Sequence, residues 1–181
     1  MLARFSPSAR DTIVRAARFA AGSGQETLGT GPLLWALAGD PLLGLDPDAV
    51  REELGASPDR DRELLATLGI DLDEVRRRAA RATSARPDDP ALWRLGRSPV
   101  LPLRVTLTGP AVRIRLDEGG RKAVEVALWS ARRGRRPLAE PGDLIWGLLA
   151  DGSSTAVRIL TRRDADLCRI WTGLRHWQQA A

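Results

Sequence analysis

Apolar residues near the start of the chain recur with the spacing of a helix. Ser6 followed by Pro7 is a helix start, because the hydroxyl can cap free amides and proline suits a first turn. Gly22 and Gly24 predict where this helix ends. The apolar positions between these signals share one helical face and are Ile13, Ala16, Ala17 and Ala20.

A second, short helix is predicted from Thr30, as its cap, through Leu37. Leu33, Leu34 and Trp35 make it apolar around most of its circumference, so we expect it to be buried. Further helical segments predicted in this half are a turn after Asp46, a helix from Arg60 to Leu68, and a helix from its cap Asp71 to Ala82.

The second half repeats this order of elements. Its first predicted helix covers 118–133 and has Asp117 as its cap, and its second covers 141–150 and begins at Pro141. A third helix, capped by Ser153 or Ser154, ends near Leu160, and a last helix covers 163–178. Between the halves, residues 84–99 have the composition of a loop. Apolar and polar residues then alternate on both sides of 108–110, which predicts a β-hairpin with Leu103, Val105 and Leu107 on one strand and Val112, Ile114 and Leu116 on the other.

A repeat with an offset of 111 residues underlies this order. Residues 31–40 (GPLLWALAGD) match residues 142–151 (GDLIWGLLAD), so that Trp35 pairs with Trp146. The same offset pairs Ala16 with Ala127 and Ala20 with Ala131 inside the preceding helices. We therefore expect a first repeat at 1–83 with an insertion at 41–59, a connector at 84–115, and a second repeat with a C-terminal tail at 116–181.

Composition narrows the class of protein. The 181 residues are 43% hydrophobic and 28% charged, which is typical of one globular domain or two small ones. No apolar run approaches the roughly 18 residues of a membrane span, and the N-terminus lacks the apolar stretch of a secretory signal. Cys168 is the only cysteine, so no internal disulfide can form and a cytoplasmic location is expected.

The charge is basic and almost entirely due to arginine. The formal net charge is +5, Lys122 is the only lysine, and arginines cluster at 76–78 and 132–136. Such clusters can bind nucleic acid through phosphate contacts. Alternatively they are solvated helix faces, where cations near predicted helix ends also complement the helix dipole.

These features together resemble the N-terminal domain of the Clp-family protein unfoldases. Arg4-Phe5-Ser6 with Ala9 is similar to the family's opening, and residues 29–37 (GTGPLLWAL) are similar to its Gly-Thr-Glu-His-Leu-Leu signature. Residues 65–71 (LATLGID) are similar to its third helix and the turn after it, and the second copy matches over about 116–170. The resemblance implies an all-α fold of two pseudo-twofold, four-helix repeats, here with a small β-hairpin in the connector.

The resemblance implies a binding protein rather than an enzyme. The family domain collects substrates and adaptor proteins for an ATP-driven unfoldase, but this sequence has no Gly-x-x-x-x-Gly-Lys-Ser/Thr phosphate loop. We therefore expect a stand-alone domain that binds Clp components, adaptors or peptide-like ligands, with no cofactor and no membrane partner. It would modulate a Clp protease or sequester ligands such as cyclic-peptide antibiotics. The alternatives are an arginine-rich nucleic-acid-binding or regulatory protein, and an assembly domain whose hairpin edge pairs with a partner strand.

The resemblance also implies two former phosphoarginine pockets. In the best-known branch of the family, the signature glutamate pairs with the guanidinium, and a helix N-terminus with its hydroxyl cap receives the phosphate. Here the glutamate positions are Gly31 and Gly142, and the caps are Ser6 and Asp117. Both guanidinium partners are missing and Asp117 would repel a phosphate, so we expect this binding to be lost. The signature histidines are replaced by Pro32 and Asp143.

A second implied site is an apolar surface near the starts of the first helices of both repeats. In actinobacterial members of the family this surface binds cyclic-peptide antibiotics. The matching residues here are Leu2, Phe5, Ile13, Leu116, Arg121 and Glu125. Leu2 and Leu116 stand where aromatic residues are common, and Arg121 replaces a lysine. The alternative is that Ile13 belongs to the core and Leu2 to a frayed terminus.

Six tryptophans without any tyrosine are a further candidate for recognition. Trp35 and Trp146 are repeat-equivalent and expected in the core. We expect Trp93, Trp171 and Trp177 either to bind a partner, with the help of neighbouring arginines, or to pack onto the domain.

Catalysis and metal binding find little support. Cys168 and the only histidine, His176, would lie about 12 Å apart on a straight helix, too far for a nucleophile and its base. A metal site would need several histidine or cysteine ligands, which the sequence lacks.

Overall fold

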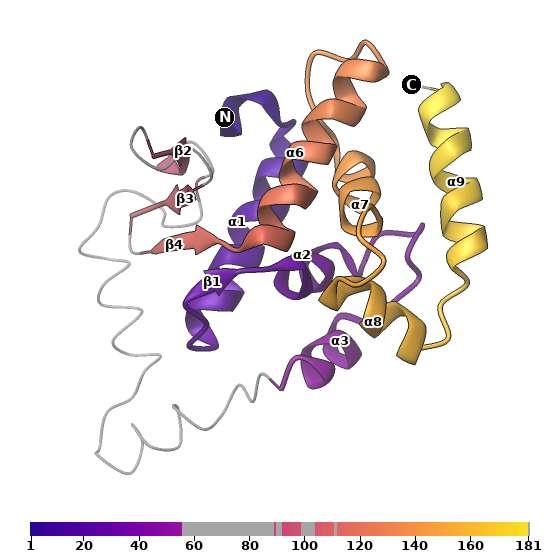
Figure 1. Ribbon diagram of the computed structural model, residues 1–181, viewed down its shortest axis with the longest axis horizontal. Coiled ribbons are helices and arrows are strands. Elements are labelled where there is room, and N and C mark those ends of the chain that lie inside the picture. Colours follow the sequence, from indigo (N-terminus) through magenta and orange to yellow (C-terminus); the bar gives the residue numbers. More distant parts are fainter. Residues whose placement is uncertain (56–88, 90–91, 99–103, 111, 181) are drawn as a thin grey trace.

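Helices make up most of the described chain (Figure 1). The computed structural model describes residues 1–55, 89, 92–98, 104–110 and 112–180. Within these residues, seven α-helices and one 3-10 turn are η1 (Leu2–Arg4), α1 (Pro7–Gly22), α2 (Thr30–Leu37), α3 (Pro47–Glu53), α6 (Glu118–Arg133), α7 (Pro141–Leu149), α8 (Thr155–Arg162) and α9 (Leu167–Ala180). The predicted helical class is thus confirmed.

The first helix of each repeat begins with an equivalent cap. Ser6 Oγ accepts a hydrogen bond from the Ala9 amide at 3.3 Å, and Asp117 Oδ1 accepts one from the Gly120 amide at 2.7 Å. Each side chain therefore satisfies one of the free amides at a helix N-terminus. α1 and α6 are both 16 residues long and begin 111 positions apart, as the repeat predicts.

Parallel backbone pairing joins the two repeats at equivalent positions. β1 (Thr27–Leu28) pairs in parallel with β4 (Arg113–Leu116), and Leu28 lies opposite Leu116. A parallel bridge also joins Phe5 to Ala139. Phe5 and Leu116 are 111 positions apart, and so are Leu28 and Ala139. The two contacts are therefore related by the pseudo-twofold symmetry of the repeats.

The connector supplies most of a four-stranded sheet in the order β1-β4-β3-β2. The antiparallel pair of β3 (Val105–Thr108) and β4 is the predicted hairpin. β2 (Arg94–Arg97) lies in the stretch expected to be a loop, so that expectation is wrong there. β2 has one buried residue, Leu95, and a single apolar position does not make the alternating pattern that predicts a strand.

α2 and α7 lie in the core, packed against α1 and α6. Their apolar residues are buried because these helices are apolar around most of their circumference. Thr30 is the first helical residue of α2 rather than its cap, which is Gly29. The Thr30 hydroxyl instead accepts a hydrogen bond from the Ala156 amide at 3.3 Å, so it links α2 to α8 of the other repeat.

Some of the remaining predicted helices lie within the described residues and others lie outside them. α9 begins at Leu167 rather than at Arg163, because Asp164 has a left-handed φ of 51° and Asp166 accepts from the Arg169 amide as a cap. α3 confirms the helical turn predicted after Asp46. The helices predicted over 60–68 and 71–82 lie outside the described residues. In the described part of the chain, no helix is long and apolar enough to cross a membrane.

Candidate functional site

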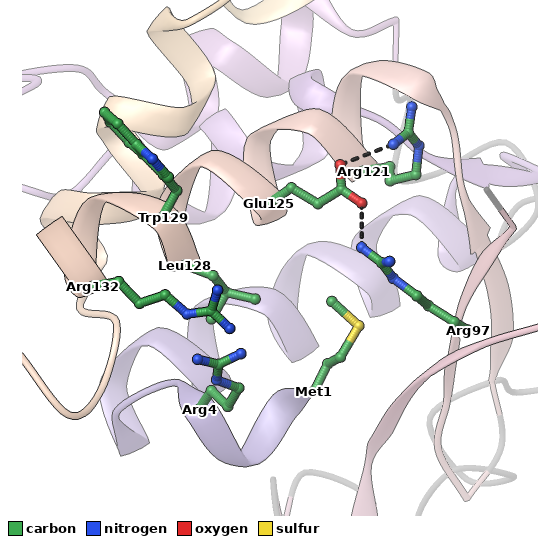
Figure 2. Close-up of a pocket in the computed structure, with 8 residues that line it drawn as sticks. All are labelled: Met1, Arg4, Arg97, Arg121, Glu125, Leu128, Trp129 and Arg132. Carbon is green, nitrogen blue, oxygen red and sulfur yellow. Dashed lines mark hydrogen bonds and ion pairs between the residues drawn. The ribbon is translucent and has the colours of Figure 1, made fainter. Parts of the chain in front are cut away.

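A cavity of about 700 Å³ opens beside η1, β2 and α6 (Figure 2). We call it the α6 cavity, and its lining residues are Met1, Arg4, Arg97, Arg121, Glu125, Leu128, Trp129 and Arg132. Its size falls within the roughly 300–1,000 Å³ of small-ligand sites. Apolar and charged side chains share the lining, so it offers both contact area and fixed polar groups.

α6 supplies five of these residues from one side of the helix. They lie at i, i+4, i+7, i+8 and i+11, and are Arg121, Glu125, Leu128, Trp129 and Arg132. Another face of α6 carries small residues, including Ala123 and Ala127, into the core. Of these five residues, the resemblance predicted only Arg121 and Glu125 as ligand-binding. The same helical spacing was the signal that points to the other three.

The Glu125 carboxylate is held between two arginines. Arg97 Nη2 donates to Oε1 at 2.6 Å, and Arg121 Nη1 donates to Oε2 at 2.9 Å. Both are charge-assisted hydrogen bonds at the short distances typical of strong ones. Because Arg97 lies on β2 and Glu125 on α6, their hydrogen bond joins the sheet to α6, while the bond from Arg121 orients Glu125 from the same helix.

The N-terminal turn that carries Arg4 is also fixed. The Arg4 carbonyl accepts from the Ala139 amide at 2.8 Å, and the terminal amine of Met1 donates to the Leu95 carbonyl at 3.3 Å. Arg10 donates to the carbonyl of Phe5 at 2.8 Å. The turn therefore presents Arg4 from a defined backbone, and no frayed terminus is found at Leu2.

The other end of the cavity carries arginines without a counter-charge. Arg4 and Arg132 extend into it from η1 and α6, and neither makes an ion pair within the described residues (Figure 2). Four arginines and one glutamate give the side chains of the lining a formal charge of +3, and the terminal amine of Met1 adds one more positive charge. Trp129 also lines the cavity, with 52% of its surface exposed, and the Arg133 guanidinium is 5.2 Å from its ring centroid.

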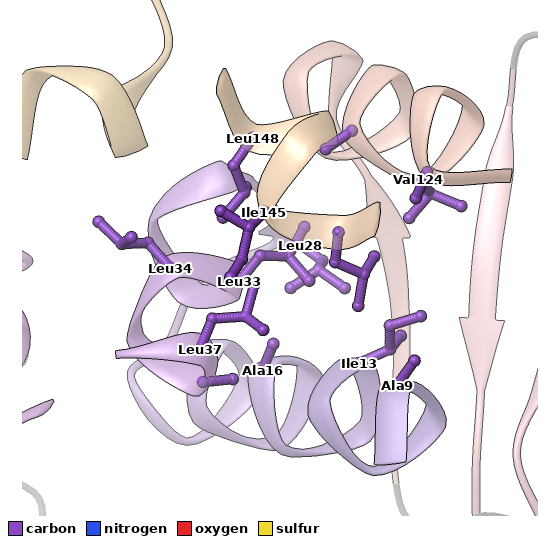
Figure 3. Close-up of a cluster of buried hydrophobic side chains, with 14 of the residues drawn as sticks. Ala9, Ile13, Ala16, Leu28, Leu33, Leu34, Leu37, Val124, Ile145 and Leu148 are labelled. Carbon is purple, nitrogen blue, oxygen red and sulfur yellow. The ribbon is translucent and has the colours of Figure 1, made fainter. Parts of the chain in front are cut away.

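The apolar residues expected to form a ligand surface lie in the core instead. They are Leu2, Phe5, Ile13 and Leu116, none more than 7% exposed. Figure 3 shows Ile13 on α1 among the side chains of the central cluster. Burying such a side chain stabilises the fold by roughly 1.5–3 kcal/mol, which favours the core over a ligand surface. From that predicted set, only Arg121 and Glu125 line the cavity.

The positions that match phosphoarginine pockets are filled by the chain itself. A Cβ added at Gly31 would lie 2.5 Å from Leu54 Cδ2, and one added at Gly142 would lie 3.0 Å from the ring of Trp177. The Ser6 and Asp117 side chains accept from their own helices, as described above. Neither Gly31 nor Gly142 therefore has open space beside it.

An arginine of the chain is bound inside the second repeat. Arg136 donates to both oxygens of Asp143, at 2.8 and 2.6 Å, and its guanidinium lies 4.2 Å from the centroid of Trp177. The side chains of Arg136 and Asp143 are 8% and 0% exposed. Asp143, at the position of a signature histidine, is therefore half of a buried ion pair.

The tryptophans that are buried and the one that is exposed differ from those predicted. Trp129, which was not predicted as a recognition residue, is the exposed tryptophan among the described residues. Trp93 is buried, and Trp171 packs edge to face on Trp146 with ring centroids 4.6 Å apart. Trp35 and Trp146 are only partly buried, at the margin of the core.

Few groups suited to catalysis or metal binding occur in the described part of the chain. Cys168 and His176 are both exposed on α9, and no group of three or more candidate metal ligands occurs there. Ser153, by its hydroxyl and then its amide, lowers the pKa of the Asp151 carboxyl, with a smaller effect of Lys122. Asp151 does not line the α6 cavity.

Comparison with solved structures assigns the fold. The chain is similar to the crystal structure of the N-terminal domain of the caseinolytic protease associated chaperone ClpD from Arabidopsis thaliana, with a TM-score of 0.58. The identity is 18%, and the match covers 97% of this chain and 98% of that chain. No family sequence model and no curated protein sequence matches it. The chain therefore has the Clp N-domain fold that its repeats predict.

Proposed function

Starting from this Clp N-domain fold, we propose that the protein is a non-catalytic binding protein that receives peptide-like ligands or adaptor segments in the α6 cavity. By this binding it modulates a Clp protease system, or sequesters ligands that target Clp N-domains, cyclic-peptide antibiotics among them. Cytoplasmic action suits its free, exposed Cys168. The observation that carries the proposal is the cavity, in which an exposed tryptophan and four arginines share one lining.

The composition of the lining suits a peptide. Tryptophan and arginine are, with tyrosine, the residues most enriched among those that dominate binding energy at protein interfaces. Trp129 and Leu128 supply apolar area for a side chain, while the Glu125 oxygens can accept a further hydrogen bond from a peptide amide. Because Arg97 and Arg121 already hold Glu125, that acceptor needs little ordering when a ligand binds.

Trp129→Ala should weaken binding of a peptide ligand about 30-fold, because truncating a dominant interface residue costs about 2 kcal/mol. Calorimetric titration with a cyclic peptide known to target Clp N-domains measures the loss. Leu92→Ala is the matched control, since Leu92 is also an exposed apolar residue, at 40%, but does not line the cavity. Equal affinity for Trp129→Ala and the wild type would exclude the cavity. No binding by the folded wild type would exclude cyclic-peptide sequestration.

We further propose that both phosphoarginine pockets are lost. The support is that Leu54 and Trp177 occupy the space at Gly31 and Gly142, and that Arg136 takes up the carboxylate of Asp143. Titration of the protein with phosphoarginine, and separately with arginine as the control ligand, tests this interpretation. A clear preference for phosphoarginine would contradict it.

A second candidate function, nucleic-acid binding, draws support from the open face of the sheet. Arg94, Arg113 and Arg115 are exposed there, and the strand register aligns Arg94 and Arg113 on either side of Thr108. Arginines on such a surface can contact successive phosphates. Binding of an oligonucleotide that falls steeply between about 50 and 200 mM salt, and is lost when these three arginines become glutamine, would favour this function. Salt-tolerant peptide binding that depends on Trp129 would favour the first.

A further inference from the structure

We propose that the α6 cavity selects peptides that carry a carboxylate, and that Arg4 and Arg132 bind this group. The inference rests on the proposed function, because it names the chemistry of the ligand for the same cavity. It concerns the end of the cavity that Glu125 does not reach.

The charges in the cavity are unevenly matched. Arg97 and Arg121 share the single carboxylate of Glu125, at 2.6 and 2.9 Å. Arg4 and Arg132 have no ion-pair partner within the described residues, although both line the same cavity. Two of the three excess positive charges of the side chains therefore lie at this end, where a ligand carboxylate would supply the missing partner.

The arrangement of the two arginines suits a carboxylate. Figure 2 shows both guanidinium groups directed into the cavity, Arg4 from η1 and Arg132 from the last turn of α6. Two like charges that face one cavity repel each other, and an anion between them adds two attractions at shorter distance that outweigh this repulsion. A guanidinium presents a planar set of donors that matches the two oxygens of a carboxylate.

The surroundings favour a peptide over a nucleic acid. Met1, Leu128 and Trp129 add apolar surface to the same lining, which suits a peptide side chain near the carboxylate. Glu125 stands in the same cavity and would repel a second phosphate of a polyanion. One anionic group with an apolar neighbour fits this lining better than a run of phosphates.

Selection from synthetic peptide libraries tests the inference. Randomised heptapeptides, one library with free and one with amidated C-termini, are captured on the immobilised full-length protein and identified by mass spectrometry. We expect enrichment of aspartate, glutamate or the free terminus beside an apolar residue. Titration of a selected peptide and its amide counterpart then distinguishes a side-chain carboxylate from the terminal one.

Variants assign the carboxylate to its partners. Arg4→Gln and Arg132→Gln should each weaken binding of the selected acidic peptide about tenfold, the loss expected for one charge-assisted hydrogen bond, and leave its amide counterpart unchanged. Arg169→Gln is the matched control, because it removes the same charge from an exposed position on α9. Thermal unfolding of each variant confirms that it is folded.

Four results would overturn the inference. Acidic enrichment that survives both substitutions, or displacement of the acidic peptide by an equal concentration of dT oligonucleotide, would indicate non-specific attraction to a basic protein. Enrichment of neutral apolar peptides that depends on Trp129 would remove the carboxylate preference but retain the proposed function. Enrichment of no peptide at all would remove both.

Discussion

Asp143→Ala should lower the free energy of unfolding by about 3–5 kcal/mol, because removing one partner of a buried ion pair leaves the other charge uncompensated. Arg136 would keep its place beneath Trp177 with no carboxylate beside it, and its side chain is only 8% exposed. The substitution also removes the acceptor of the Glu140 amide at 2.9 Å, at the start of α7. Urea denaturation followed by circular dichroism measures the change.

Two further variants separate the ion pair from other effects of the substitution. Arg136→Met combined with Asp143→Leu removes both charges, so it should be less destabilising than Asp143→Ala alone. Asp11→Ala is the surface control, since Asp11 pairs with Arg15 at 4.0 Å where both side chains are about half exposed. It should cost between about 0 and 1 kcal/mol. If Asp143→Ala were as mild as this control, the Arg136 charge would be stabilised by something other than Asp143.

The buried pair also shows what the repeat could and could not predict. Offsetting by 111 positions relates Arg135 to Gly24, and both have left-handed backbones, with φ of 55° and 69°. The next amides, of Arg136 and Gln25, both donate to the carbonyl five residues earlier at 2.9 Å. The repeat thus specifies the turn. It does not reveal that Arg136 reaches Asp143, because Gln25 and Pro32, the equivalents in the first repeat, cannot form that pair.

Local sequence signals predicted most helices of the described chain and where they begin. Caps such as Ser6 and Asp117 act on amides three residues away, so a short stretch of sequence contains both partners. The pairing of β1 with β4 instead joins Leu28 to Leu116, and no local pattern marks a two-residue strand. This pairing depends on how the two repeats pack, which only the three-dimensional structure shows.

The α6 cavity was predictable only where one helix defines it. Glu125 and Trp129 are four residues apart on α6, so their shared face follows from the helical period. Arg97 and Arg4 reach the same cavity from β2 and η1, elements that no periodicity connects to α6. The resemblance also placed Leu2 and Leu116 on the ligand surface. Burial of apolar area accounts for their position in the core.

Gly147 marks a second place where packing overrides local preference. A Cβ built there would overlap the carbonyl oxygen of Ala123 and lie 2.8 Å from its carbonyl carbon. These are backbone atoms of α6, so no side-chain rotation can relieve the overlap. The repeat-equivalent residue is Ala36, which is buried with its methyl group in place. α6 and α7 therefore cross at a distance that only glycine permits at position 147.

Gly147→Ala should lower the free energy of unfolding by about 2–3 kcal/mol, although alanine favours a helix over glycine by about 1 kcal/mol. Gly22→Ala is the matched control, because Gly22 is helical and nothing lies within 4 Å of an added Cβ, so it should be neutral or slightly stabilising. Urea midpoints at an unchanged m-value measure both. Relief of the overlap shifts α6, which carries Glu125 and Trp129, relative to α7, so Gly147→Ala should also weaken peptide binding by the molecules that remain folded. Equal responses at the two glycines would mean that helix propensity alone governs Gly147.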